Sequence, residues 1–141
     1  MTEAYRRAHV VATGSRHEGF CVPVIEGLAA GCVPVSYAIS NLRYIAGGLG
    51  VLAIDDTPEG LAASLKGVVD AIGAPCNATK TLRLQRGSMS LKDFDSAADI
   101  YVEDFTLGRF SQRTSNKVRD LVSPPVSPLA EAHYGGWVTL E

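Results

Sequence analysis

The sequence predicts an α/β fold in which a parallel sheet of about three strands is flanked by helices. Three short apolar runs are typical of buried strands, and each is followed by a segment with helix caps or a helical spacing of apolar residues. Alternation of this kind favours right-handed crossover connections and hence a parallel sheet. The 141 residues, of which 46% are hydrophobic and 20% charged, suit a single globular domain with its own core.

The first half of the chain contains two of these strands with a loop and a helix between them. The β-branched run HVVAT predicts the first strand, and the polar segment GSRHEGF after it predicts a loop. Pro23 suits the first turn of a helix, where its missing N–H costs nothing, and Gly31 predicts the end of that helix. The second strand, VPVSYA, is apolar enough to be covered on both faces.

Two helices surround the third strand. A short helix capped by Ser40 or Asn41 precedes this strand, which is the run LGVLAI. A longer helix follows, with Thr57 as its cap and Pro58 at its first position. Its apolar residues then recur at helical spacing, so it can cover one face of the sheet.

Beyond residue 75 the pattern predicts two further helices and a tail. The helices are SLKDFDSAADIYVEDF and TLGRFSQRTSNKVRDLV. The second is basic, and its charged face is either solvated or a docking surface for another domain. The segment over residues 123–141 is rich in Pro and Gly and predicts irregular structure. We therefore expect an ordered domain over residues 1–122 and an irregular C-terminal tail over residues 123–141.

Composition and charge exclude several classes of protein. The net charge of -2 argues against a nucleic-acid-binding surface, which is usually strongly basic. The sequence contains no run of about 18 apolar residues, so we expect no membrane span. The N-terminus MTEAYRRAH lacks the apolar stretch of a secretory signal. The three cysteines form no CxxC pair and no ligand pattern with histidine. We therefore expect reduced thiols, a cytoplasmic location and no metal site.

The loop GSRHEGF stands where ligands bind in this class of fold. In an open parallel α/β sheet, ligands bind outside the carboxyl ends of the strands, and this loop directly follows HVVAT. The helix start after it offers amide N–H groups around Phe20 and Cys21 and the positive end of the helix dipole. Both favour an anion such as a phosphate. Gly19 allows the backbone to approach a ligand closely.

Two glutamates with seven residues between them, Glu18 and Glu26, flank this helix start. Glu18 lies in the loop, where it can accept hydrogen bonds from ligand hydroxyls, and Glu26 lies about one turn inside the helix. Two carboxylates beside a phosphate site suit a ligand that also brings hydroxyls, as a nucleotide sugar does. The alternative is that Glu26 only complements the helix dipole, by about 0.3–1 kcal/mol, and that Glu18 is a solvated loop residue.

The same residues resemble a known family. The stretch SRHEGFCVPVIEGLAAGCVPVS is similar, nearly position by position, to the pattern S-x-x-E-G-F-G-x-P-x-x-E-A-x-A-x-G-x-P-V. This pattern, with its E-x7-E motif, is typical of retaining GT-B glycosyltransferases of the group 1 or family 4 type. The segment GLGVLAIDDTPEGLAASL resembles the part of the family pattern that follows this motif, and FTLGRFSQRT is more weakly similar to the terminal helix of the family. The resemblance implies that residues 1–122 form a partial, Rossmann-like, nucleotide-sugar-binding domain, the second half of a GT-B C-terminal domain.

The resemblance also implies roles for individual residues. The donor is a nucleotide-diphospho-sugar, and transfer retains the anomeric configuration. Glu18 lies beside the donor sugar as the catalytic residue, and the backbone amides of Gly19, Phe20 and Cys21 hold sugar hydroxyls and phosphate. Glu26 binds the ribose hydroxyls. The donor phosphate takes the proton of the acceptor, so no cofactor and no metal is expected.

Several positions depart from the family pattern. Cys21 replaces the usual glycine, so it either restricts the donor sugar or points away. Gly27 stands where alanine is common, which costs the helix about 1 kcal/mol. SNLRY replaces the usual G-x-P-E turn and brings Arg43 to the position of an acid, either on the surface or at a ligand. Arg16 either helps to neutralise phosphate or is a solvated loop residue.

The length of the chain limits the expected activity. A complete enzyme of this family has an N-terminal acceptor domain and a full donor domain, and the Arg and Lys that clamp the diphosphate come from βα units upstream of the stretch that resembles it. We therefore expect a donor-domain fragment that binds a nucleotide-diphospho-sugar, has little transferase activity alone and exposes HVVAT as an unpaired edge strand. Such a fragment requires the missing acceptor domain or a partner chain. The alternatives are a non-catalytic GT-B-like module that assembles with a partner chain, and a decayed fragment that aggregates.

Overall fold

The structure, a computed structural model, describes residues 2–74 and 80–122. It divides the chain into two compact units, of which the first runs to Thr106 and the second begins at Leu107. The described part of the second unit is helix α6 (Leu107–Val122), and every residue of this helix is exposed. The predicted tail over residues 123–141 lies outside the described residues.

The first unit is built on a three-stranded parallel sheet. Strands β1 (Val10–Thr13), β2 (Val33–Ser36) and β3 (Val51–Leu52) lie in the order β1-β2-β3. Val10 pairs with Val33, and both pairs of neighbouring strands are parallel. The predicted α/β fold is therefore confirmed. Within the described residues β1 pairs with β2 alone, so it is the edge strand that the sequence predicts.

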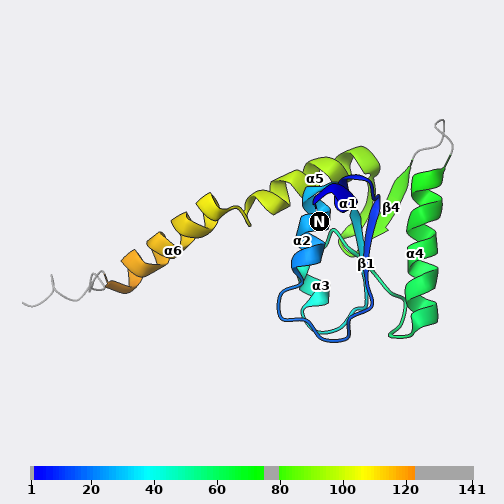
Figure 1. Cartoon of the computed structure of the whole chain (residues 1–141), viewed down its shortest axis with the longest axis horizontal. Helices are drawn as coiled ribbons and strands as arrows, with labels where there is room; N and C mark the ends of the chain where they lie inside the picture. Colours follow the sequence, from blue (N-terminus) through cyan, green and yellow to red (C-terminus); the bar gives the residue numbers. More distant parts are fainter. Residues whose placement is uncertain (1, 75–79, 123–141) are drawn as a thin grey trace, which may run out of the picture. The chain divides into compact units, whose positions relative to one another are not determined.

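Helices α2 (Val22–Ala29) and α4 (Pro58–Gly73) cover opposite faces of this sheet (Figure 1). The cap of α4 is the predicted one, because Thr57 Oγ1 accepts a hydrogen bond from the amide of Gly60 at 3.0 Å. Gly31 ends α2 as predicted, with a φ of 79° that suits glycine. The β1–α2–β2 unit is thus a crossover connection of the expected kind.

Two short helices lie at opposite ends of the strands. Helix α1 (Thr2–Arg6) precedes β1 and is tied to the start of β2, because the thiol of Cys32 lies 3.4 Å from the carbonyl oxygens of Tyr5 and Ala8. Helix α3 (Leu42–Ile45) follows β2. Its start therefore lies at the carboxyl edge of the sheet, where the sequence predicts the candidate site.

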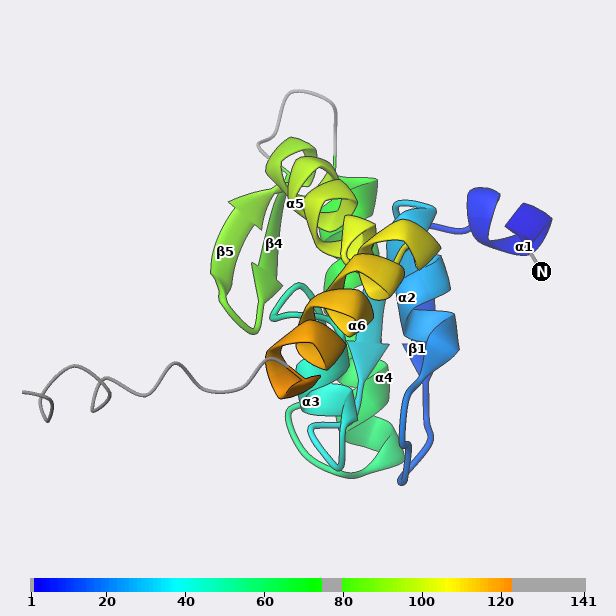
Figure 2. The ribbon, with the colours of Figure 1, turned by 90° about the vertical axis from the view of Figure 1, so that its left-hand side faces the viewer.

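The segment after residue 79 contains a β-hairpin that the sequence pattern did not predict. Strands β4 (Thr81–Leu84) and β5 (Gly87–Ser90) are antiparallel and lead into helix α5 (Leu91–Glu103). Figure 2 shows the hairpin beside α5. The hairpin is attached next to β3, because the amide of Gln85 donates to the carbonyl of Gly50 at 2.9 Å. The predicted helices correspond to α5 and α6.

The core lies between the sheet and the helices. Its fully buried members include Leu28, Val33, Val35, Leu42, Leu49, Leu82 and Phe94. Helix α2 packs closely on β1, since a Cβ at Gly27 would lie 2.5 Å from Val11 Cγ1. Glycine at residue 27 lowers the local stability of the helix, and the close approach of α2 to β1 explains why no side chain is present there. No helix in the described part of the chain is long and apolar enough to cross a membrane.

Candidate functional site

The loops that follow the three parallel strands meet at the carboxyl edge of the sheet. Arg16, in the loop after β1, donates from Nη2 to the carbonyl oxygen of Asp56 at 2.8 Å, and Asp56 follows β3. The guanidinium of Arg16 also lies 5.4 Å from the ring centroid of Tyr37, which follows β2. Because the strand order is β1-β2-β3, Arg16 extends toward β3 and away from the open edge of β1. These contacts join the three loops, and a role of Arg16 at phosphate stays a prediction.

The loop over residues 18–21 is held by the loop between β2 and α3. Ser40 Oγ donates to the carbonyl oxygen of Glu18 at 3.1 Å, and Asn41 Nδ2 donates to the carbonyl oxygen of Gly19. Asn41 precedes α3 without capping it through its side chain. The loop after β1 therefore has a defined conformation, although most of it is exposed.

The amide N–H groups of this loop are available to a ligand. Among residues 2–74 and 80–122, no hydrogen bond is found for the N–H groups of Gly19, Phe20 and Cys21. No atom lies within 4 Å of a Cβ built on Gly19, so the space beside its backbone is open. Cys21 is the N-cap residue of α2, and its side chain makes no capping hydrogen bond. The start of α2 thus presents donors and the positive end of its dipole to solvent.

The side chain of Cys21 points into the core. It is 3% exposed and belongs to the main hydrophobic cluster with Val24 and Leu28. Burial raises the pKa of the Cys21 thiol; a hydrogen bond with the Val24 backbone lowers it, and the charge of Glu18 raises it further. The thiol is therefore protonated at neutral pH, and its bulk lies away from the exposed face of the loop.

Phe20 connects the loop to the end of α5. Its ring centroid lies 5.8 Å from that of Phe105, and Phe105 makes an edge contact at 5.2 Å with Tyr101. The hydroxyl of Tyr101 donates to the carbonyl oxygen of Ile45 at 2.8 Å. This aromatic row was not found from the sequence, because its members are adjacent only after α5 has packed against the rest of the first unit.

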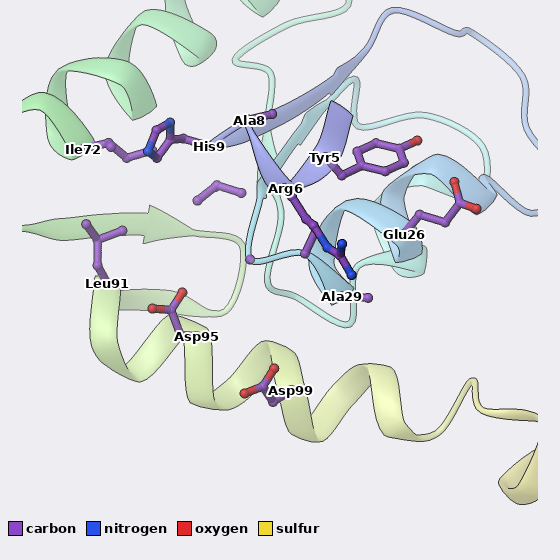
Figure 3. A pocket seen from close by; sticks show the side chains of 13 residues that line it. Tyr5, Arg6, Ala8, His9, Glu26, Ala29, Ile72, Leu91, Asp95 and Asp99 are labelled. Carbon is purple, nitrogen blue, oxygen red and sulfur yellow. The ribbon is translucent and has the colours of Figure 1, made fainter. Parts of the chain in front are cut away.

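Glu26 is exposed on α2 and interacts with Tyr5 of α1. Desolvation raises the pKa of the Tyr5 hydroxyl, and the charge of Glu26 and a side-chain hydrogen bond with it raise this pKa further. Figure 3 shows the Tyr5 ring directed toward Glu26. Tyr5 was not predicted from the sequence, because nothing in the E-x7-E spacing refers to the helix before β1.

Glu26 also borders a cavity of about 820 Å³ at the amino ends of β1 and β2 (Figure 3). The wall of this cavity includes Tyr5, Arg6, His9, Glu26, Asp95 and Asp99. The other predicted site residues, Arg16 and residues 18–21, do not line it. The structure therefore brings residues 18–21 together with the β2–α3 loop and brings Glu26 together with Tyr5. Within the described residues, no group of three or more His, Cys, Asp or Glu side chains is arranged to hold a metal ion.

Of the comparisons with known proteins, one gave a match, and that match is to a protein family. No curated protein and no solved structure matches the chain. The family described as Glycosyl transferases group 1 matches residues 1–71, more than half of the 141 residues. The matched region contains the whole parallel sheet, the loop with Glu18 and the helix with Glu26. The chain therefore belongs to the glycosyl transferases group 1 family.

Proposed function

We propose that this chain binds a nucleotide-diphospho-sugar and forms the donor-binding half of a retaining GT-B glycosyltransferase. The proposal rests on the open amide groups of the loop over residues 18–21, in a chain that belongs to this transferase family. Its amide donors lack partners within the described residues and stand at the start of α2, beside a carboxylate. A ligand with a diphosphate and several hydroxyls can satisfy both kinds of group.

The diphosphate is assigned to the amide groups of Gly19, Phe20 and Cys21. Hydrogen bonds from backbone N–H groups to a charged oxygen contribute about 1.5–3 kcal/mol each, and the α2 dipole adds a smaller favourable term. The buried thiol of Cys21 leaves this face clear, so only its backbone takes part. No metal is needed for this mode of phosphate binding.

The two glutamates are assigned to the hydroxyls of the ligand. Glu18, half-buried and with its carbonyl held by Ser40, lies beside the donor sugar as the catalytic residue of the E-x7-E motif. Glu26 accepts hydrogen bonds from the ribose hydroxyls. A carboxylate has about four acceptor positions, so Glu26, which is exposed and interacts with Tyr5, is still able to bind ribose. The donor phosphate takes the proton of the acceptor, and we expect little transfer by this chain alone.

A second candidate function is a non-catalytic GT-B-like module that assembles with a partner chain. Within residues 2–74 and 80–122, one edge of β1 has no partner strand, and this favours the second candidate because an open edge is a template for another strand. The His9 carbonyl accepts from the Val33 amide, so residues 9, 11 and 13 face β2, and the Ala12 N–H faces the open edge. Ala12→Pro removes that N–H without removing a bond to β2. If this candidate is right, Ala12→Pro abolishes assembly with the partner, and Glu18→Ala with Glu26→Ala leaves all function intact.

The donor-binding proposal is tested by calorimetry with UDP-, GDP- and ADP-sugars. We expect the wild type to bind one of these classes and Glu18→Gln with Glu26→Gln to weaken binding at least about tenfold, which is ~1.4 kcal/mol. Glu59→Gln is the matched control, since Glu59 is exposed in the first turn of α4 and outside the site. Absence of binding to every donor, or equal binding by the double variant, would contradict the proposal.

A further inference from the structure

The loop after β2 has an unusual backbone conformation where it contacts the loop after β1. Ser40 has a φ of 49°, and it is the one non-glycine residue with positive φ in the described part of the chain. In this conformation its hydroxyl donates to the carbonyl oxygen of Glu18 at 3.1 Å. Residues other than glycine rarely adopt this region unless the surrounding structure imposes it. The contact with Glu18 is therefore made at the expense of local backbone geometry.

The next residue, Asn41, shows a related conflict with local preference. Asparagine directly before a helix usually caps it with its side chain. Here Asn41 precedes α3 without a side-chain capping bond, and its Nδ2 instead donates to the carbonyl oxygen of Gly19. Two adjacent residues thus depart from local rules, and both contact consecutive peptide groups of the same loop. Departures of this kind are expected where function imposes them.

The two hydrogen bonds determine where the loop amides point. In a trans peptide the C=O and the following N–H point in opposite directions. The carbonyls of Glu18 and Gly19 are bonded to the β2–α3 loop, so the N–H groups of Gly19 and Phe20 point away from it. A hydrogen bond to the carbonyl also polarises the N–H of the same peptide group, which makes it a stronger donor.

We propose that Ser40 and Asn41 are positioning residues that hold the carbonyls of Glu18 and Gly19 and thereby aim the amides of Gly19 and Phe20 at the donor diphosphate. The inference rests on the proposed function, because the ligand is the one assigned there. Ser40 and Asn41 touch the loop backbone and act through it. The segment SNLRY, which contains both residues, stands at the turn where the pattern that the chain resembles has G-x-P-E.

The test compares Ser40→Ala with Asn41→Ala, alone and combined, in the full ¹⁵N-labelled chain. Ser88→Ala combined with Asn116→Ala is the matched control, because both residues are exposed and lie outside the loops. Ser40→Gly is the second variant at residue 40, since it removes the hydroxyl but suits the positive φ. Amide chemical shifts report the conformation of the loop. The probes are pyrophosphate, a nucleoside diphosphate and the unphosphorylated nucleoside.

We expect the combined variant to shift the amide signals of Gly19 and Phe20 and to weaken both phosphate-containing probes about tenfold, because two amides that bind phosphate lose the hydrogen bonds that orient them. Binding of the nucleoside alone should stay within error of the control, which shows that the variant remains folded. Unchanged amides, or changed amides with unchanged affinity for the phosphate probes, would overturn the inference. If the wild type binds none of the probes, the proposed function and this inference both fail. If the wild type binds and the variant binds equally, only this inference fails.

Discussion

Replacing Gly27 by alanine tests how closely α2 must approach β1. In an exposed helix, glycine to alanine stabilises by about 1 kcal/mol. At residue 27, however, a Cβ would lie 2.5 Å from Val11 Cγ1 and 2.9 Å from Val11 Cβ. Relieving this overlap requires a shift of about 1 Å, and overpacking of this kind costs about 1–3 kcal/mol. We therefore expect Gly27→Ala to lower the free energy of unfolding by about 1 kcal/mol overall.

Gly67→Ala is the matched control for this prediction. Gly67 lies inside α4, is exposed, and has no atom within 4 Å of a built Cβ. Gly67→Ala should therefore raise the free energy of unfolding by about 1 kcal/mol. Adding Val11→Ala to Gly27→Ala removes the closer of the two overlaps. The double variant should therefore be about 1 kcal/mol more stable than the sum of the two single substitutions predicts.

The assay is urea unfolding followed by circular dichroism, with equal denaturant slopes required for comparison. The reasoning is refuted if Gly27→Ala stabilises the chain as much as Gly67→Ala does. It is also refuted if Val11→Ala is equally destabilising with glycine and with alanine at residue 27. Either result would mean that α2 and β1 lie farther apart than the distance of 2.5 Å between a Cβ at residue 27 and Val11 Cγ1 implies.

Three further predictions concern groups around the site. Gly47→Ala should lower the melting temperature strongly, because Gly47 has a φ of 57° and a Cβ there would lie 2.3 Å from the Tyr101 ring; we expect a loss of about 2–4 kcal/mol. Cys21 should react slowly with a thiol reagent at pH 8 in the folded chain and rapidly in denaturant, because burial raises its pKa; a fast reaction in the folded chain would contradict its buried position. The raised pKa of Tyr5 means that folding favours the protonated phenol. This stabilisation is complete below about pH 10 and is lost as the pH rises through the folded-state pKa. Glu26→Gln should therefore lower the pKa of Tyr5 in an NMR titration, and an unchanged value would exclude the interaction.

Much of the first unit could be predicted from the sequence, because its signals are local. Thr57 and Pro58 mark the start of α4, and Gly31 marks the end of α2. The β4–β5 hairpin was missed although part of its signal was present. Leu82 and Leu84 alternate with exposed residues, and Gly87 has a φ of 126° that permits a tight turn.

The parts of the site that escaped prediction depend on tertiary contacts. The reason for glycine at residue 27 is visible only when β1 lies against α2. On local grounds the sequence favours Asn41 as a helix cap, but in the structure its side chain makes no capping bond and donates to Gly19 instead. Likewise Tyr5 meets Glu26 because α1 packs beside α2, which no spacing rule specifies.

The donor-binding account is tested most directly by an amide shift map of the ¹⁵N-labelled chain during titration with the nucleotide-diphospho-sugar that calorimetry selects. The account predicts that the largest shifts fall on Gly19, Phe20 and Cys21, with a smaller response around Glu26. Shifts confined to the cavity beside His9 and Asp95, with the loop unmoved, would contradict it.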